Sequence, residues 1–248
     1  NVWVRRALNY AVDREAIARD LLKGSRRAWG NYTPNGYPGY GHPPGLTFDP
    51  ARARECLKRA GYPGGKGLRT IAILFNTSDD HRRIAEAIQA MWKRELGIDV
   101  ELSNQEWGSY LGACTSLQYD IARRSWIGDY LDPNTFLAMM VSGDGNNRCG
   151  YSNPRYDALI RAAAAEIDPA KRFAILKDAE ALVLDELPII PIYHYSTTEL
   201  VKPYLRGLYQ TALDTHPLKR VWIDRAWRRG EAVAADDAAA PRADSGHR

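Results

Sequence analysis

Residues 68–102 read LRTIAILFNTSDDHRRIAEAIQAMWKRELGIDVEL, and this stretch decides the fold class. Residues 68–76 are rich in apolar and β-branched side chains, which predicts a buried strand. Residues 79–96 have the spacing of an amphipathic helix, whose apolar side carries Ile84, Ile88, Met91 and Trp92. Residues 98–102 alternate as a second strand would. The stretch therefore predicts a βαβ unit with parallel strands and a right-handed crossover.

The same alternation continues on both sides of this unit. A helix over residues 106–117 and a strand over 119–126 repeat the pattern, so the predicted class is α/β. Residues 30–47, rich in Gly, Pro and Tyr, predict a surface connection. Aspartates stand where helix caps are expected, at Asp13, Asp49 and Asp168. The other predicted elements are helices over residues 2–12, 14–23, 50–60, 154–167 and 169–185, and a strand over 189–195.

Composition excludes several classes of protein. The 248 residues are 45% hydrophobic and 26% charged, and no apolar run approaches the length of about 18 residues that spans a bilayer. A net charge of +4 without a concentrated basic face argues against nucleic acid as a partner. The three cysteines, Cys56, Cys114 and Cys149, lack the spacing of a metal site.

Catalytic and metal-binding patterns are also missing from the sequence. It has no G-x-S-x-G, H-E-x-x-H or C-x-x-C motif and no phosphate-binding glycine loop. His81 and Glu86 are five residues apart, which does not make them neighbours on a helix. Asp129, Asp132 and Asp144 miss the alternation of a calcium loop, and Asp132 before Pro133 suits a helix cap. We therefore expect a protein that is not an enzyme and that has no metal and no cofactor.

The segment Arg123–Tyr130, RRSWIGDY, is the most informative for function. It places two large aromatic residues and an acid after a basic pair, at the carboxyl end of the predicted strand. Ligands bind at that end of strands in open α/β sheets. The alternative is that Trp126 packs in the core and that the charges are only solvated. Composition leaves both interpretations open.

Several motifs together resemble one family. They are ALNYAVDR at residues 7–14, NTS at 76–78, NQEW at 104–107, SWIGDY at 125–130 and DELPIIPIY at 185–193. Their order and spacing resemble the oligopeptide-binding proteins of ABC importers, extracellular solute-binding proteins of family 5. The resemblance covers about residues 1–224.

This resemblance implies a fold and a domain organisation. Residues 1–196 would form the second, ligand-grasping lobe of a periplasmic-binding-protein-like fold of type II, cluster C. Residues 197–224 would be a return segment that belongs to the first lobe, whose main body would precede Asn1 in a truncated chain. Residues 225–248, rich in Ala, Asp and Arg without an apolar period, predict a disordered tail. The parent protein would be a periplasmic monomer that delivers short peptides to permease subunits in the inner membrane.

The resemblance also implies the ligand-binding residues. Asp129 matches the carboxylate that holds the peptide's α-ammonium group. Trp107 and Trp126 match residues that line side-chain pockets. Arg123 and His81 match basic positions that meet peptide carboxylates, where a guanidinium pairs bidentately and a protonated imidazole adds charge.

Two features of the sequence leave alternatives open. A basic residue that the family has at the position of Cys114 is absent, so carboxylate capture differs here, and the cysteine itself suits a small buried helix residue. Strand alternation would place Arg123 and Asp129 on the face opposite Trp126, unless the chain bends after Ser125 near Gly128. The alternative functions are binding of murein peptides, dipeptides or another small solute, and hydrolysis of an unknown type.

Overall fold

The computed structural model describes residues 1–196, 199–209, 211 and 213–227. They divide into two compact units. The first contains Asn1–Trp126 and Asp132–Ser196, and the second contains Ile127–Leu131 and the residues after Ser196. The chain therefore leaves the first unit after Trp126, returns at Asp132 and leaves again after Ser196.

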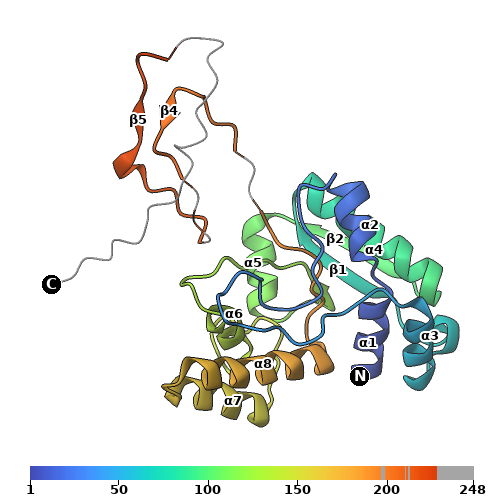
Figure 1. Cartoon of the computed structure of the whole chain (residues 1–248). Helices are drawn as coiled ribbons and strands as arrows, with labels where there is room; N and C mark the ends of the chain where they lie inside the picture. Colours follow the sequence, from blue (N-terminus) through green and yellow to red (C-terminus); the bar gives the residue numbers. More distant parts are fainter. Residues whose placement is uncertain (197–198, 210, 212, 228–248) are drawn as a thin grey trace. The chain divides into compact units, whose positions relative to one another are not determined.

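A parallel sheet of three strands organises the first unit, in the order β2-β1-β3. The strands are β1 (Ile71–Asn76), β2 (Val100–Gln105) and β3 (Ile121–Ala122). Helix α4 (Asp79–Leu96) joins β1 to β2 and packs on the sheet (Figure 1). All four apolar residues predicted for its inner side are buried, and the Trp92 indole donates a hydrogen bond of 2.9 Å to the Leu8 carbonyl. The predicted βαβ unit is confirmed.

Two predicted strands are shorter or absent, and in the second of them Pro191 has no amide to pair. Only Ile121–Ala122 of residues 119–126 pairs as a strand, and the chain departs after the Arg123 amide has donated to the Leu74 carbonyl. Residues 189–195 form no strand, and Tyr193 contributes a single bridge to Ala28. The carbonyls of Ile189 and Pro191 instead accept hydrogen bonds from the side chains of Asn9 and Arg14.

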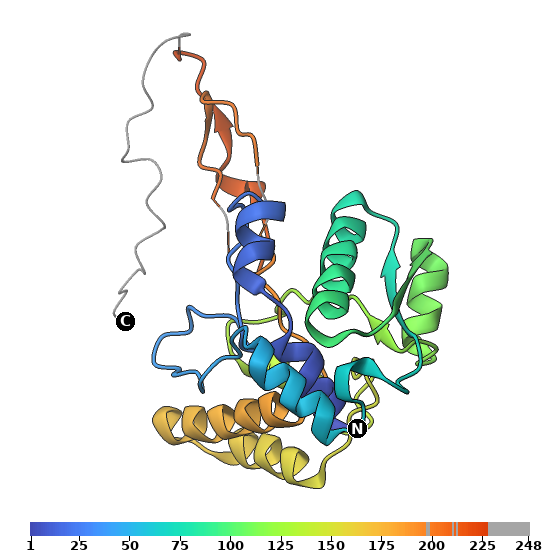
Figure 2. The same cartoon turned by 90° about the vertical axis from the view of Figure 1, so that its right-hand side faces the viewer.

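Helices close to the N-terminus form one side of the core. They are α1 (Val2–Tyr10), α2 (Arg14–Ala16) with the π-helix η1 (Ile17–Leu21), and α3 (Pro50–Arg59), followed by the short 3₁₀ turn η2 (Pro63–Gly65). Helices α1 and α3 lie side by side (Figure 2). Asp13 and Asp49 accept the amides of Ala16 and Arg52, so both predicted caps are confirmed. The helix predicted over 14–23 ends earlier, because α2 widens into η1 after one turn.

The remaining helices of the first unit stand on either side of β3 in the sequence. Helix α5 (Trp107–Thr115) precedes β3, and it is followed by α6 (Asn134–Leu137), the 3₁₀ turn η3 (Ala138–Met140), α7 (Pro154–Ala165) and α8 (Pro169–Glu186). Helices α7 and α8 run side by side (Figure 1). Asp168 caps α8 by accepting the amides of Ala170 and Lys171, as predicted.

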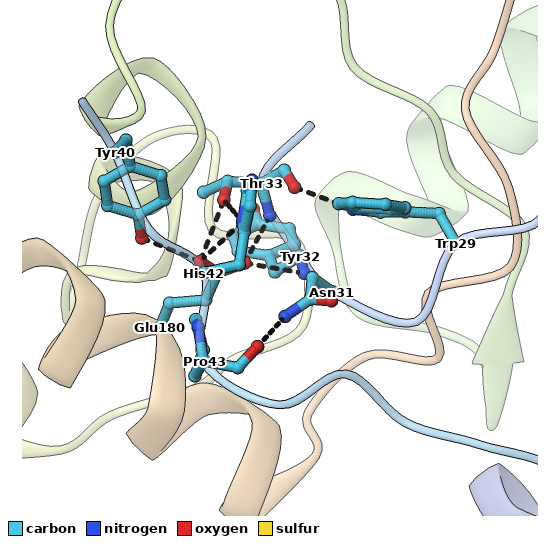
Figure 3. Close-up of polar contacts among 8 residues, drawn as sticks. All are labelled: Trp29, Asn31, Tyr32, Thr33, Tyr40, His42, Pro43 and Glu180. Carbon is cyan, nitrogen blue, oxygen red and sulfur yellow. Dashed lines mark hydrogen bonds and ion pairs between the residues drawn. The ribbon is translucent and has the colours of Figure 1, made fainter. Parts of the chain in front are cut away.

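A buried carboxylate on α8 fixes the loop of residues 30–47 (Figure 3). Glu180 Oε1 accepts the amides of Tyr32 and Thr33 at 3.0 and 2.8 Å. Its Oε2 accepts the hydroxyls of Thr33 and Tyr40 at 2.9 and 2.7 Å, with His42 Nδ1 at 3.4 Å. Residues 31, 33 and 40 are buried. The prediction of a surface connection is therefore wrong for this part of the loop, because the carboxylate satisfies backbone donors that would otherwise need water.

The described part of the second unit contains a small antiparallel pair, β4 (Leu205–Arg206) and β5 (Trp222–Ile223), with the 3₁₀ turn η4 (Leu218–Arg220) between them. Arg206 and Asp224 form an ion pair of 3.4 Å. Of the tail predicted to be disordered, Arg225–Trp227 are described and residues 228–248 lie outside the described residues. No helix in the described ranges is both long and apolar enough to cross a membrane.

Candidate ligand-binding site

The carboxyl ends of the three parallel strands meet at one edge of the sheet. There β1 ends at Asn76 and β2 at Gln105, while Arg123 follows β3. The Thr77 amide donates to the Gln105 carbonyl at 3.0 Å, which extends the pairing beyond the strands. The Thr77 hydroxyl donates to Asn104 Oδ1 at 3.0 Å. This edge therefore carries polar groups from all three strands.

At or shortly after the ends of the three strands in the sequence, four residues carry a buried polar atom without a hydrogen-bond partner among the described residues. They are Asn76 Oδ1, His81 Nδ1, Gln105 Oε1 and Trp126 Nε1. Leaving such a group unpaired costs about 1–3 kcal/mol, so native proteins contain few of them. Both donors and acceptors are present, which suits a ligand with groups of both kinds, or water.

His81 and Arg123 lie close enough to influence each other's charge. His81 is in the first turn of α4, which begins three residues after β1 ends at Asn76. Burial of the imidazole, and next the charge of Arg123, lower the pKa of His81 below its usual value of 6.5. Both effects favour the neutral imidazole, whereas an anion bound beside it would favour the protonated form that the resemblance implies.

Arg26 joins this cluster, although the sequence analysis missed it. Its guanidinium carbon lies 4.4 Å from the centroid of the Tyr195 ring, and that of Arg123 lies 5.8 Å from the same centroid. Arg26 also approaches Asp80 at 3.8 Å, but its Nε is buried without a hydrogen-bond partner among the described residues. The pair Arg26-Arg27 is the only local signal, and no spacing rule connects it to Arg123 or Tyr195.

Aromatic residues connect α5 to the same edge. Trp107, the first residue of α5, is 57% exposed and stacks on Tyr110 with ring centroids 5.6 Å apart. Burial raises the pKa of Tyr110, and its hydroxyl donates to the Arg123 carbonyl. An exposed indole held flat by a buried neighbour offers an apolar wall to a ligand side chain.

Asp129 lies in the other compact unit, in the segment Ile127–Leu131. The neighbouring apolar side chains in that segment are solvent-exposed, at 50% for Ile127, 45% for Tyr130 and 69% for Leu131. The acid is thus part of an exposed apolar segment. The structure brings His81, Arg123 and Trp107 to one edge, whereas the role of Asp129 stays a prediction.

The comparisons with known proteins identify the family. Residues 1–148 match the family model described as bacterial extracellular solute-binding proteins, family 5, middle region. The chain belongs to this family.

Relatives of this family 5 chain include named peptide-binding proteins. It is 37% identical over 212 residues to the periplasmic murein peptide-binding protein MppA of Escherichia coli K12, which covers 82% of the chain and 39% of MppA. It is 36% identical over 216 residues to the oligopeptide-binding protein OppA of Bacillus subtilis, which covers 84% of the chain and 40% of OppA. The chain spans about two fifths of the length of these curated relatives.

Solved structures agree with this assignment. The structure of Escherichia coli MppA superposes with a TM-score of 0.83 at 33% identity, over 90% of this chain and 45% of MppA. A Haemophilus influenzae OppA complex with the peptide RPPGFSPFR gives 0.80 at 31% identity, over 91% of this chain and 46% of OppA. The predicted family and the predicted α/β periplasmic-binding-protein-like fold are both confirmed.

Two further expectations concern Cys114 and metals in this family 5 chain. Cys114 is fully buried beside Leu74 and Tyr110, which confirms it as a small core residue. Within the described ranges, no three His, Cys, Asp or Glu side chains gather as a metal site would require. The guanidinium groups and aromatic rings at the described edge can pair with anions and stack on flat groups.

Proposed function

We propose that this chain is the ligand-grasping part of the solute-binding component of an ABC importer for short peptides. The observation that carries the proposal is the cationic, aromatic edge of the sheet formed by Arg26, Arg123, His81 and Trp107, in a chain of a binding-protein family. Residues 1–196 would form the second lobe, and residues 197–224 would return to the first lobe. The complete protein would be a periplasmic monomer that passes peptides to permease subunits, without catalysis and without a cofactor.

Charges would fix the two ends of the peptide, and main-chain pairing would hold its middle. Asp129 would pair with the α-ammonium group. Arg123, with Arg26 beside the same Tyr195 ring, would pair with the carboxylate. A carboxylate in this place would also favour protonation of His81, because an anion nearby raises the pKa of an imidazole. Trp107 and Trp126 would line pockets for side chains.

Calorimetry with trialanine, its N-acetyl form and its C-terminal amide tests this proposal on the complete gene product. We expect N-acetylation to weaken binding at least about a hundredfold, since removing one partner of a buried ion pair costs about 3–5 kcal/mol. Asp129→Asn should abolish the difference, whereas Asp144→Asn, at an exposed turn residue, should preserve it. Equal affinity for the free and the N-acetylated peptide would remove the ammonium-pairing role.

A murein peptide is the second candidate ligand, because E. coli MppA, a murein peptide-binding protein, is 37% identical to this chain. Competition between trialanine and a murein tripeptide for the same site distinguishes the two candidates. Binding of the murein peptide alone would assign the chain to cell-wall peptides.

A further inference from the structure

A basic cavity lies in the first unit, between the end of η1 and the segment that follows it. Its volume is about 500 Å³, which is enough room for a ligand side chain. The charged residues of its wall are Glu15, Arg19, Lys23, Arg26 and Arg27. Four cations and a single acid in one wall favour an anion as the occupant.

Most of this positive charge is not neutralised by neighbouring acids. Arg19 pairs with Asp20 at 2.7 Å. Within the described part of the chain, neither Lys23 nor Arg27 forms an ion pair. The guanidinium carbon of Arg27 lies 5.7 Å from the centroid of the Trp29 ring, a contact that leaves its charge in place. Lys23 and Arg27 are therefore available to an anion in the cavity.

The end of η1 does not need these cations as caps. The Leu22 amide donates to the Ile17 carbonyl at 3.0 Å. The Gly24 amide donates to the Ala18 carbonyl at 2.9 Å. Ser25 donates from its amide and its hydroxyl to the Leu22 carbonyl. Basic side chains often lie at helix ends because they bind free carbonyls there, but here the main chain and a serine already satisfy these three.

Arg26 belongs both to this cavity and to the cationic edge of the sheet. Its guanidinium carbon lies 4.4 Å from the centroid of the Tyr195 ring, which Arg123 approaches to 5.8 Å. The Arg26 side chain is only 15% exposed, and its ion pair with Asp80 is long, at 3.8 Å. Its buried Nε has no hydrogen-bond partner among the described residues. A ligand group that binds Arg26 at the edge therefore lies next to the cavity.

We propose that the cavity is a subsite for an acidic side chain of the bound peptide, beside the carboxylate at the peptide's C-terminus. The inference rests on the proposed function, in which Arg123 and Arg26 receive that terminal carboxylate. The favoured ligands are peptides whose last residue is acidic, because its side-chain carboxylate is only a few bonds from the terminal one. Lys23 and Arg27 supply the charge that attracts this second carboxylate, and Glu15 opposes it.

Calorimetry on the complete gene product with the peptides Ala-Ala-Glu and Ala-Ala-Gln measures this preference. The two peptides have nearly the same shape and differ in the charge of the last side chain. The ratio of the Kd for Ala-Ala-Gln to the Kd for Ala-Ala-Glu therefore reports the subsite, while trialanine, measured in parallel, reports the proposed function. We expect a wild-type ratio of at least about five, since each partly exposed ion pair contributes up to a few-fold in affinity.

Three variants of exposed wall residues test the subsite. Lys23→Met and Arg27→Met should each lower the ratio about two- to threefold, because each removes one cation from the wall. Glu15→Gln should raise the ratio about twofold, because it removes the opposing charge. All three should leave the Kd for Ala-Ala-Gln within about twofold of the wild type. Lys177→Met, at an exposed position of α8, removes the same charge elsewhere and should leave the ratio unchanged.

The outcomes separate the subsite from the proposed function. A ratio that falls in Lys23→Met and Arg27→Met and rises in Glu15→Gln supports the subsite. A wild-type ratio in these variants overturns it, because the preference for the acid would then come from other residues. A ratio of one in a wild-type protein that binds trialanine also overturns the subsite and leaves the proposed function intact. A complete protein that binds none of the three peptides removes the proposed function and the subsite together.

Discussion

Replacing Glu180 with Gln tests how the loop of residues 30–47 is held. The carboxylate accepts four hydrogen bonds, two on each oxygen, and the side chain is fully buried. A glutamine keeps one oxygen for the two amides and turns its NH₂ group toward the Thr33 and Tyr40 hydroxyls, which can accept as well as donate. All four contacts then lose the charge of the carboxylate, and a charge-assisted hydrogen bond is stronger than a neutral one by about 1–1.5 kcal/mol.

Some relaxation of the loop offsets this loss, so we expect Glu180→Gln to lower the free energy of unfolding by about 3–5 kcal/mol. For a chain of this length, 1 kcal/mol corresponds to about 2–4 °C, which gives a decrease in Tm of about 6–20 °C. Tyr40→Phe removes the hydroxyl that donates to Glu180 Oε2 at 2.7 Å, and it should lower the free energy of unfolding by about 1–2 kcal/mol.

Urea denaturation and thermal unfolding, both followed by circular dichroism, measure these values. Asp178→Asn, on the exposed side of α8, is the matched control and should stay within about 0.5 kcal/mol of the wild type. A Glu180→Gln protein within about 1 kcal/mol of the wild type would refute the reasoning, because it would mean that the charge of the carboxylate adds almost nothing to the four contacts.

Four other predictions concern His81, Gly30 and the length of the chain. Arg123→Met should raise the pKa of His81 toward 6.5 in an NMR titration of the imidazole, and an unchanged value would show that burial alone sets it. The pKa of His81 is lower in the folded protein than in the unfolded chain, so unfolding takes up protons. The free energy of unfolding should therefore rise with pH until about 6.5, above which His81 is neutral in both states. Gly30→Ala should destabilise the loop by about 1–3 kcal/mol in urea, since its Cβ would lie 2.2 Å from the Leu46 carbonyl oxygen, whereas Gly41→Ala, with open space, should be neutral. The chain of residues 1–248 alone should show no micromolar binding of trialanine by calorimetry, because it spans about two fifths of its relatives, and tight binding would contradict the two-lobed proposal.

Local patterns predicted the elements that depend on local physics. The apolar period of α4 and the caps at Asp13, Asp49 and Asp168 were correct, because helix periodicity and capping involve residues a few positions apart. The strand predicted over 189–195 was wrong, because the carbonyls of Ile189 and Pro191 accept hydrogen bonds from Asn9 and Arg14, about 180 residues earlier in the chain. A local sequence pattern cannot predict hydrogen bonds between such distant residues.

The site residues divide in the same way. Motif resemblance named His81, Arg123 and Trp107, which the structure places at one edge, but nothing near Arg26 predicts its position beside Tyr195. Glu180 did leave a signal that could have been used. It shares the buried side of α8 with Leu176, Ala179 and Val183, and an acid at an apolar position requires buried donors.

The route of the chain between its two units has a practical consequence for shortened versions of the protein. Cutting after Ser196 follows the boundary between the units but leaves residues 127–131 behind, separated from the rest of the unit to which they belong. The apolar side chains of Ile127, Tyr130 and Leu131, which are exposed, would remain on the shortened chain, and exposed apolar surface promotes self-association. Solubility of a chain that ends at Ser196 should improve when these three side chains are replaced by polar ones.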